Sequence, residues 1–232
     1  MNLLEVERIN SFYGDSHILF DVSLEVAEHE VVALLGRNGA GKTTTLKSLM
    51  GVLAPKSGAI RLGGRDIAGR PPHEIAALGM QLVPEERRIF GTLTVEENLT
   101  LAALSAPQKL SLREIYDMFP RLEERRKNSG KQLSGGEQQM LAIARALIRD
   151  ARLILLDEPF EGLAPVIVHD LLAITAKLAE AGRTIVIVEQ NVAAALSVAH
   201  RAIVLANGQV VWQGTTASLR QSPEIMKTYL GV

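Results

Sequence analysis

The chain has 232 residues, with 25 Lys and Arg against 26 Asp and Glu, a net charge of −1 and no cysteine. This balance gives no electrostatic footprint for nucleic acid or for an anionic membrane, and without cysteine there is neither a disulfide framework nor a thiolate metal site. The length suits one large domain or two small ones, and the start MNLLEVERIN does not resemble a secretory signal. No apolar run approaches the ~18 residues of a membrane span, so we expect no membrane-spanning helix in this chain.

The first chemically informative segment is residues 31–43. The apolar run at residues 31–35 predicts a strand, and GRNGAGKT at residues 36–43 matches the P-loop pattern that cradles nucleotide phosphates. Its glycines let the backbone approach phosphate oxygens, while the N–H groups and the helix N-terminus attract negative charge. Lys42 is expected to contact the β- and γ-phosphates, and Thr43 to bind Mg²⁺. The predicted nucleotide ligands of this loop are Gly36, Asn38, Gly39, Ala40, Gly41, Lys42, Thr43 and Thr44.

Residues 92–150 are mainly helical in pattern, and we predict a helical subdomain inserted into a core of residues 1–91 and 151–232. Within it, LSGGEQQ at residues 133–139 precedes a helix with apolar periodicity. The hydroxyl of Ser134, the N–H groups of Gly135 and Gly136 and the positive end of the helix dipole suit a second phosphate-binding segment. A simple capped helix start describes the local pattern equally well.

The segment LILLDE at residues 153–158 predicts a buried strand that ends in two acids. Ligands of open α/β sheets bind at the carboxyl ends of the strands. We therefore expect Asp157 to hold Mg²⁺ through water and Glu158 to orient or deprotonate the attacking water. An acidic pair alone can also simply begin a loop, so this interpretation depends on the P-loop.

The C-terminal part continues an α/β pattern. Ile167, Leu171, Ile174 and Leu178 form the stripe of a helix that Pro165 can begin. The apolar run at residues 184–188 predicts another buried strand. Asn207-Gly208 between two apolar runs predicts a tight β-hairpin.

With these motifs in this order, the chain resembles the ATP-binding subunits of ABC transporters along essentially its whole length. The resemblance implies one nucleotide-binding domain over residues 1–232: a P-loop NTPase α/β core, an antiparallel β subdomain and the inserted helical subdomain. It implies hydrolysis of ATP with Mg²⁺ by two subunits arranged head to tail, as a homo- or heterodimer. Ser134, Gly135 and Gly136 would then bind the ATP held by the partner's Lys42.

The resemblance also assigns roles at positions where this sequence departs from the family pattern. Tyr13 matches the aromatic that stacks on adenine, with Phe12 as the alternative. Glu85 occupies the position of the coupling-loop glutamine and is a candidate metal ligand. Gln190 occupies the position of the switch histidine, and Ala164 that of an aspartate after the acidic pair.

The loop from Glu85 through Arg87 and Arg88 to Phe90 would dock a cytoplasmic helix of a separate transmembrane permease. The chain is accordingly expected at the cytoplasmic face of the membrane as a peripheral subunit. The same resemblance implies an extracytoplasmic substrate-binding protein in the system, and no nucleic-acid partner.

The closest local matches are to importers of branched-chain amino acids and related amides. They are the motifs VPE, TVEENL, GLAP and VEQN, at residues 83–85, 94–99, 162–165 and 188–191. We therefore expect an ATPase that powers import of branched-chain or other amino acids. The alternatives are a urea or short-amide importer, a non-transport ABC ATPase, and an inactive regulatory subunit, against which Glu158 argues.

Overall fold

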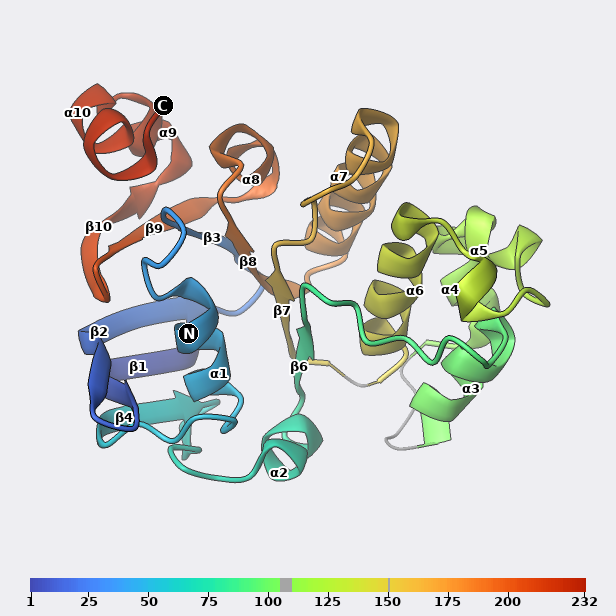
Figure 1. The fold of residues 1–232 in the computed structure, drawn as a ribbon, viewed down its shortest axis with the longest axis horizontal. Helices are drawn as coiled ribbons and strands as arrows, with labels where there is room; N and C mark the ends of the chain where they lie inside the picture. The colour runs from blue at the N-terminus through green and yellow to red at the C-terminus, as the bar shows by residue number, and fades with distance from the viewer. Residues whose placement is uncertain (105–109, 150) are drawn as a thin grey trace.

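Two β-sheets share one hydrophobic core in the computed structural model, which describes residues 1–104, 110–149 and 151–232 (Figure 1). The smaller sheet has the order β2-β1-β4-β5, and all its neighbouring strands are antiparallel. Its strands are β1 (Asn2–Tyr13), β2 (Ser16–Ala27), β4 (Ser57–Leu62) and β5 (Arg65–Asp66).

The larger sheet has the order β10-β9-β3-β8-β7-β6 and is parallel except at its β10 edge. Its strands are β3 (Val31–Leu35), β6 (Met80–Val83), β7 (Leu153–Asp157), β8 (Thr184–Glu189), β9 (Arg201–Ala206) and β10 (Gln209–Thr215).

The central strand β3 is apolar at every position because it is covered on both faces. Val32 and Leu34 pack into the core shared with the antiparallel sheet, whereas Val31, Ala33 and Leu35 pack into a second core on the helical side. Successive side chains of a strand point to opposite faces, so a strand covered on both sides needs apolar residues at every position.

Helices cover both faces of the larger sheet. On the side of the antiparallel sheet lie α1 (Lys42–Leu49), directly after the P-loop, and α2 (Pro72–Ala77). On the other side lie α7 (Pro165–Glu180), α8 (Val192–Val198) and α9 (Thr216–Arg220). The chain then runs through α10 (Pro223–Ile225) and a π-helical turn (Met226–Leu230).

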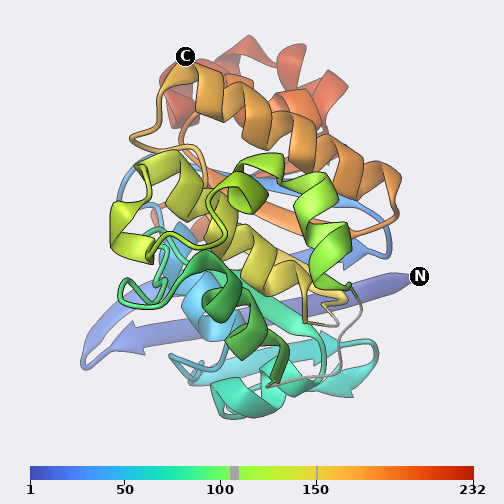
Figure 2. The same ribbon diagram turned by 90° about the vertical axis from the view of Figure 1, so that its right-hand side faces the viewer.

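Four helices lie together beyond the β6 edge, at the right of Figure 1 and towards the viewer in Figure 2. They are α3 (Val95–Leu104), α4 (Leu112–Met118), α5 (Pro120–Glu124) and α6 (Gly135–Leu147), with a 3₁₀ turn (Gly130–Gln132) before α6. Helices α3 and α5 both pack against α6. Residues 105–109 and 150 of the predicted helical subdomain lie outside the described residues, and the subdomain boundary stays a prediction.

The structure confirms the α/β fold class with its antiparallel sheet, the three buried strands and the Asn207-Gly208 hairpin between β9 and β10. The predicted stripe of α7 faces the core: Leu171 and Leu178 are buried, and Ile167 and Ile174 are half-buried against the same core. Thr175, which was not predicted, is buried as well, and its hydroxyl donates to the Leu171 carbonyl at 2.8 Å. Within the described ranges, no helix combines the length and apolar character needed to cross a bilayer.

Candidate functional site

A cavity of about 390 Å³ lies at the carboxyl ends of β3, β7 and β8, where the P-loop meets the segments after β7 and β8. Ten of the residues predicted from the sequence line it: Tyr13, Asn38, Gly39, Gly41, Lys42, Thr43, Thr44, Glu85, Glu158 and Gln190. Ile18 and Glu161 line it as well and were not predicted. A cavity of this size at this edge of the sheet is suited to a small-molecule ligand.

The P-loop is held in shape by the conformation of its glycines and by hydrogen bonds from Lys42 to its carbonyl groups. Gly41 has a φ of 107°, and a Cβ there would lie 2.9 Å from a methyl group of Leu19, so only glycine fits. Lys42 is only 4% exposed, and its ammonium group donates to the carbonyls of Gly36 at 2.9 Å and Arg37 at 3.3 Å. Gly36 and Ala40 are buried parts of the loop that do not line the cavity.

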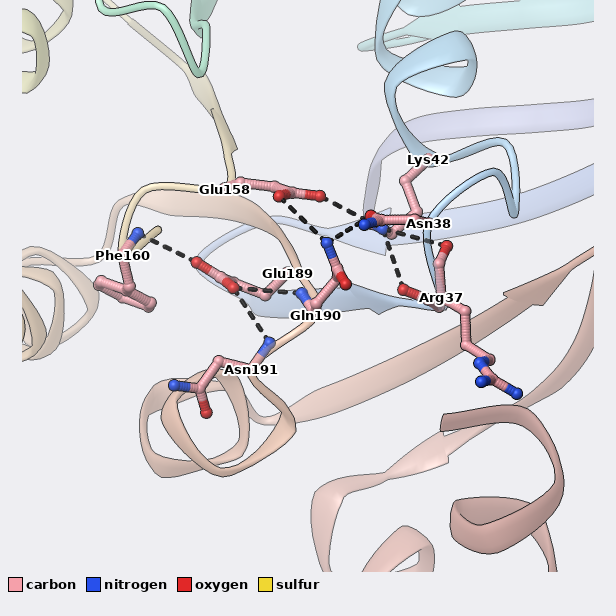
Figure 3. A network of polar contacts seen from close by, with 9 residues as sticks. Arg37, Asn38, Lys42, Glu158, Phe160, Glu189, Gln190 and Asn191 are labelled. Carbon is pink, nitrogen blue, oxygen red and sulfur yellow. Dashed lines mark hydrogen bonds and ion pairs between the residues drawn. The ribbon is translucent and has the colours of Figure 1, made fainter. Parts of the chain in front are cut away.

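The ammonium group of Lys42 also lies 3.3 Å from the carboxylate of Glu158 (Figure 3). The side-chain amide of Gln190 joins the same network, since it donates to Asn38 of the P-loop and, at 3.5 Å, to Glu158. Three segments far apart in the sequence therefore meet through four polar side chains. Although partial burial acts in the opposite direction, the hydrogen bond to Glu161 and the charge of Lys42 lower the pKa of Glu158, which favours its carboxylate form.

Glu161 brings a second carboxyl group to Glu158. The hydrogen bond and the negative charge of Glu158 raise the pKa of Glu161 to about 7. Two carboxyl groups in contact cannot both be ionised without repulsion, so near neutral pH the pair shares a proton part of the time. In the sequence, Glu161 is simply a third acidic residue in the loop after β7, and no general motif distinguishes it from an ordinary loop residue.

Asp157 lies behind the cavity and is only 4% exposed. Its Oδ1 has no hydrogen-bond partner among the described residues. Burial, and then the charges of Glu158 and Glu85, raise the pKa of Asp157 to about 6. An unpartnered buried carboxylate oxygen next to other acids suits a cation, and Mg²⁺ prefers oxygen ligands.

Glu189, at the end of β8, was also missed from the sequence. It is buried, and burial raises its pKa, yet its two oxygens accept from the backbone N–H groups of Phe160 at 3.0 Å, Gln190 at 3.1 Å and Asn191 at 3.2 Å (Figure 3). It ties the loop that carries Glu158 to the loop that carries Gln190. An acid directly after a fully apolar run was the available signal.

Comparison with known proteins explains this geometry. Residues 19–161 match the family described as "ABC transporter". The chain belongs to the ABC transporter family. It is therefore an ATP-hydrolysing transport subunit, of a kind that dimerises and works with transmembrane permease components.

Full-length relatives span more than one transport system. The chain is 42% identical to the high-affinity branched-chain amino acid transport ATP-binding protein BraG of Pseudomonas aeruginosa, over 99% of this chain and all of BraG. It is 37% identical to the lipopolysaccharide export system ATP-binding protein LptB of Haemophilus influenzae, over 100% and 98% of the two chains. A solved structure described as the ATP binding subunit of an ABC transporter superposes with a TM-score of 0.83 at 32% identity, covering 99% and 96%.

The ABC signature segment does not reach the cavity of its own chain. Ser134, Gly135 and Gly136 do not line it, and begin α6 instead. Ser134 caps this helix: its hydroxyl accepts from the N–H of Glu137 at 3.3 Å, and Glu137 accepts from the N–H of Ser134 at 2.8 Å. A Cβ at Gly136 would lie 2.4 Å from the side chain of Ile167 on α7. The capped-helix interpretation is therefore correct locally, and the phosphate-binding role stays a prediction.

The two aromatic candidates for the adenine of this ABC ATPase lie in different surroundings. The ring of Phe12 stacks on His17 with centroids 4.0 Å apart. Tyr13 lines the cavity, and its side chain is 44% exposed. Tyr13 suits the adenine role better than Phe12, because Tyr13 lines the cavity and Phe12 does not, although the ammonium group of Lys47 lies 5.7 Å from the centre of the Tyr13 ring.

The described residues contain no group of three or more His, Cys, Asp and Glu side chains that could hold a metal ion by itself. Nucleotide-bound Mg²⁺ commonly takes one or two protein groups together with substrate phosphates. Thr43 and Glu85 in the cavity and Asp157 behind it fit such a partial ligand set. Their ligation of Mg²⁺ stays a prediction.

Proposed function

We propose that this ABC ATPase powers the import of branched-chain amino acids through a separate permease. The main observation in support of ATP hydrolysis is that Lys42, Glu158 and Gln190 line the same cavity. There, Glu158 is ion-paired with Lys42 and accepts a hydrogen bond from Gln190. The full-length similarity to BraG, a branched-chain amino acid transport protein, supports the substrate class.

In the proposed reaction the phosphates of ATP lie along the P-loop, with Lys42 on the β- and γ-phosphates and Tyr13 against adenine. Glu158 orients the attacking water and accepts its proton, since its carboxylate form is favoured. Gln190 senses the γ-phosphate through its neutral amide. When bound, Mg²⁺ would be held by Thr43 and Asp157, with Glu85 nearby, and would neutralise charge on the phosphates.

The proposed working unit is a pair of ATPase subunits arranged head to tail. Ser134, Gly135 and Gly136 of each subunit complete the ATP site of the other. This explains why the signature segment begins a helix outside the cavity of its own chain. The partner is a second copy or a related ABC subunit.

The permease is proposed to contact the loop from Glu85 to Phe90, which places the subunit at the cytoplasmic face of the membrane. Phe90 is 44% exposed, so its ring is available to a partner. An extracytoplasmic binding protein would deliver the substrate.

Lipopolysaccharide export is the second candidate, because LptB is 37% identical over nearly the full length of both chains. Import of urea or short amides is a third candidate, because the motifs at residues 83–85, 94–99, 162–165 and 188–191 suit amide importers as well as amino-acid importers.

The test is to co-express the chain with its permease partner and to reconstitute the complex in liposomes with the binding protein of the same system. We expect ATP-dependent uptake of labelled leucine, and none with Lys42→Ala. Uptake of urea instead of leucine would transfer the assignment to amides. ATP turnover without uptake of either, together with extraction of lipopolysaccharide, would favour export.

A further inference from the structure

The carboxylate of Glu189 joins the two loops that carry Glu158 and Gln190 (Figure 3). Glu189 ends β8 and is 2% exposed. Its Oε1 accepts from the N–H of Phe160 in the loop after β7, whereas its Oε2 accepts from the N–H groups of Gln190 and Asn191 in the loop after β8. Backbone donors from both loops therefore surround one buried carboxylate.

A carboxylate is the side-chain group that fits this arrangement. An ionised carboxylate accepts hydrogen bonds at both oxygens, whereas an amide has one accepting oxygen and one donating nitrogen. Glutamine in place of Glu189 would therefore turn its NH₂ group towards a backbone N–H of one loop or the other and leave that donor unpaired. The three hydrogen bonds also offset the free-energy cost of burying a negative charge.

The loop after β7 depends on such contacts because of the backbone of Glu158. Its φ of 47° lies in the left-handed region, which residues other than glycine keep only where surrounding contacts hold them. The N–H of Glu158 donates to the carbonyl of Val188 at 2.9 Å, and its carbonyl accepts from the N–H of Glu161 at 3.2 Å. Two residues after Glu158, the ring of Phe160 is buried in the core and its N–H is held by Glu189. These contacts fix the turn that presents Glu158 to the nucleotide cavity.

The same carboxylate fixes the start of the loop after β8. Gln190 follows Glu189 directly, and its side-chain amide donates to Asn38 and, at 3.5 Å, to Glu158. Asn191 then caps helix α8 through its side chain. The position of the Gln190 amide relative to Glu158 thus depends on backbone that Glu189 holds on both sides.

We infer that Glu189 is a positioning residue for ATP hydrolysis, whose carboxylate holds the loop of Glu158 against the loop of Gln190 so that both side chains stay directed at the γ-phosphate. This inference rests on the proposed function, in which Glu158 is the base. Glu189 does not line the nucleotide cavity, so it acts on turnover through Glu158 and leaves the nucleotide contacts of the P-loop in place. A small displacement of a catalytic group is enough to slow the chemical step strongly.

Thr184, at the other end of the same strand, provides a matched control. It is 3% exposed, and its hydroxyl accepts from the N–H of His29 at 3.0 Å, so Thr184→Val also removes a buried acceptor from the N–H of a loop. Thr184 does not line the nucleotide cavity either. We expect both Thr184→Val and Glu189→Gln to unfold at a lower urea concentration than the wild type, but only Glu189→Gln to change turnover.

The test measures steady-state ATP hydrolysis by the assembled transporter and the Mg-ATP affinity of the full chain by calorimetry. Glu189→Gln should lower kcat at least about ten-fold and change Kd by less than about three-fold. Thr184→Val should keep the wild-type kcat. Hydrogen exchange at the N–H groups of Phe160 and Gln190 should be faster in Glu189→Gln than in the wild type, and unchanged in Thr184→Val.

A double-variant cycle separates positioning from a general loss of stability. If Glu189 acts through Glu158, adding Glu189→Gln to Glu158→Gln should lower kcat no further, because the base is already absent. A second fall in kcat as large as that of Glu189→Gln alone would overturn the inference. So would a wild-type kcat in Glu189→Gln.

Glu189→Asp keeps the charge but is one methylene shorter, so it should lose the contact with Phe160 and keep those with Gln190 and Asn191. Its kcat should lie between those of the wild type and Glu189→Gln. It decides the question where Glu189→Gln does not fold, since a wild-type kcat in Glu189→Asp would then overturn the inference. Lost turnover in Glu158→Gln with a wild-type kcat in the Glu189 variants contradicts this inference alone, whereas wild-type turnover in Glu158→Gln contradicts the proposed base.

Discussion

The ammonium group of Lys42 lies 3.3 Å from the carboxylate of Glu158, so the proposed phosphate-binding cation is paired with the proposed general base. Both side chains are nearly buried, with exposed fractions of 4% and 9%. A phosphate that binds Lys42 must compete with this carboxylate. In the proposed reaction, nucleotide binding would therefore be coupled to the release of Glu158 towards the attacking water through this one ion pair.

Replacing Lys42 with alanine should abolish tight Mg-ATP binding, because the P-loop then lacks its point charge. Calorimetry with Mg-ATP measures this, and circular dichroism should show a retained fold. Lys127→Ala, at an exposed position after α5, is the control and should bind ATP normally. Unchanged ATP affinity in Lys42→Ala would remove the residue from its assigned role.

Glu158→Gln keeps the size and hydrogen bonding of the side chain but cannot accept a proton. We expect turnover to fall at least ~10²-fold while ATP still binds. ATP should then hold two subunits together, visible as a dimer in size-exclusion chromatography. ADP should bind more tightly than to the wild type, because its phosphates no longer compete with a carboxylate for Lys42. A variant with wild-type turnover would show that another group serves as the base.

Gln190→Ala should be milder than Glu158→Gln. The variant removes one neutral hydrogen bond, to Asn38, which contributes about 0.5–1.5 kcal/mol net, and one long contact of 3.5 Å to the Glu158 carboxylate. The steady-state ATPase rate of the assembled transporter gives the ranking. Gln190→His should add a pH-dependent step between about pH 5 and 8, since an imidazole titrates there and an amide does not. Equal loss in Gln190→Ala and Glu158→Gln would show that this position organises catalysis.

Glu161 should make the nucleotide-free chain less stable as the pH rises from 5 to 7. Its pKa is raised from 4.5 to about 7 in the folded chain, chiefly by its hydrogen bond to Glu158. The folded state therefore binds more protons than the unfolded state in this range, and the free energy of unfolding falls as the pH increases. Urea denaturation at pH 5 and pH 7 should show a smaller difference for Glu161→Gln than for the wild type. Glu180→Gln, at the exposed end of α7, should leave the difference unchanged.

Ser134 and Ser111 allow the structural and functional roles of a helix cap to be separated. Each forms a capping box, with N–H to carboxylate distances of 2.8 and 2.7 Å respectively and hydroxyl contacts of 3.3 Å. Either alanine variant should lose about 0.5–2 kcal/mol of stability in urea denaturation. Only Ser134→Ala should also lower the ATPase rate of the assembled transporter, by about ten-fold or more, because only Ser134 faces the partner's ATP in the proposed dimer. Equal ATPase rates in the two variants would show that Ser134 only caps its helix and does not act on the partner's ATP.

The sequence by itself determined the parts of this protein whose chemistry depends on local order. GRNGAGKT at residues 36–43 predicted a tight turn after a strand, and Asn207-Gly208 predicted a hairpin between two strands, because both depend on backbone freedom within a few residues. The continuous apolar runs of β3, β7 and β8 likewise revealed strands buried on both faces.

Only the tertiary structure decided which distant side chains meet. The Lys42–Glu158 pair, the contact of Gln190 with Asn38 and the anchoring of two loops by Glu189 join segments more than 25 residues apart. Nothing in the local sequence shows that Glu161 lies against Glu158. Nor does it show that the Nε of Arg149 is buried without a hydrogen-bond partner among the described residues. The pKa shifts and the strength of the ion pair depend on burial and on the distance between charges. Both are defined only once the strands lie side by side in the folded sheet.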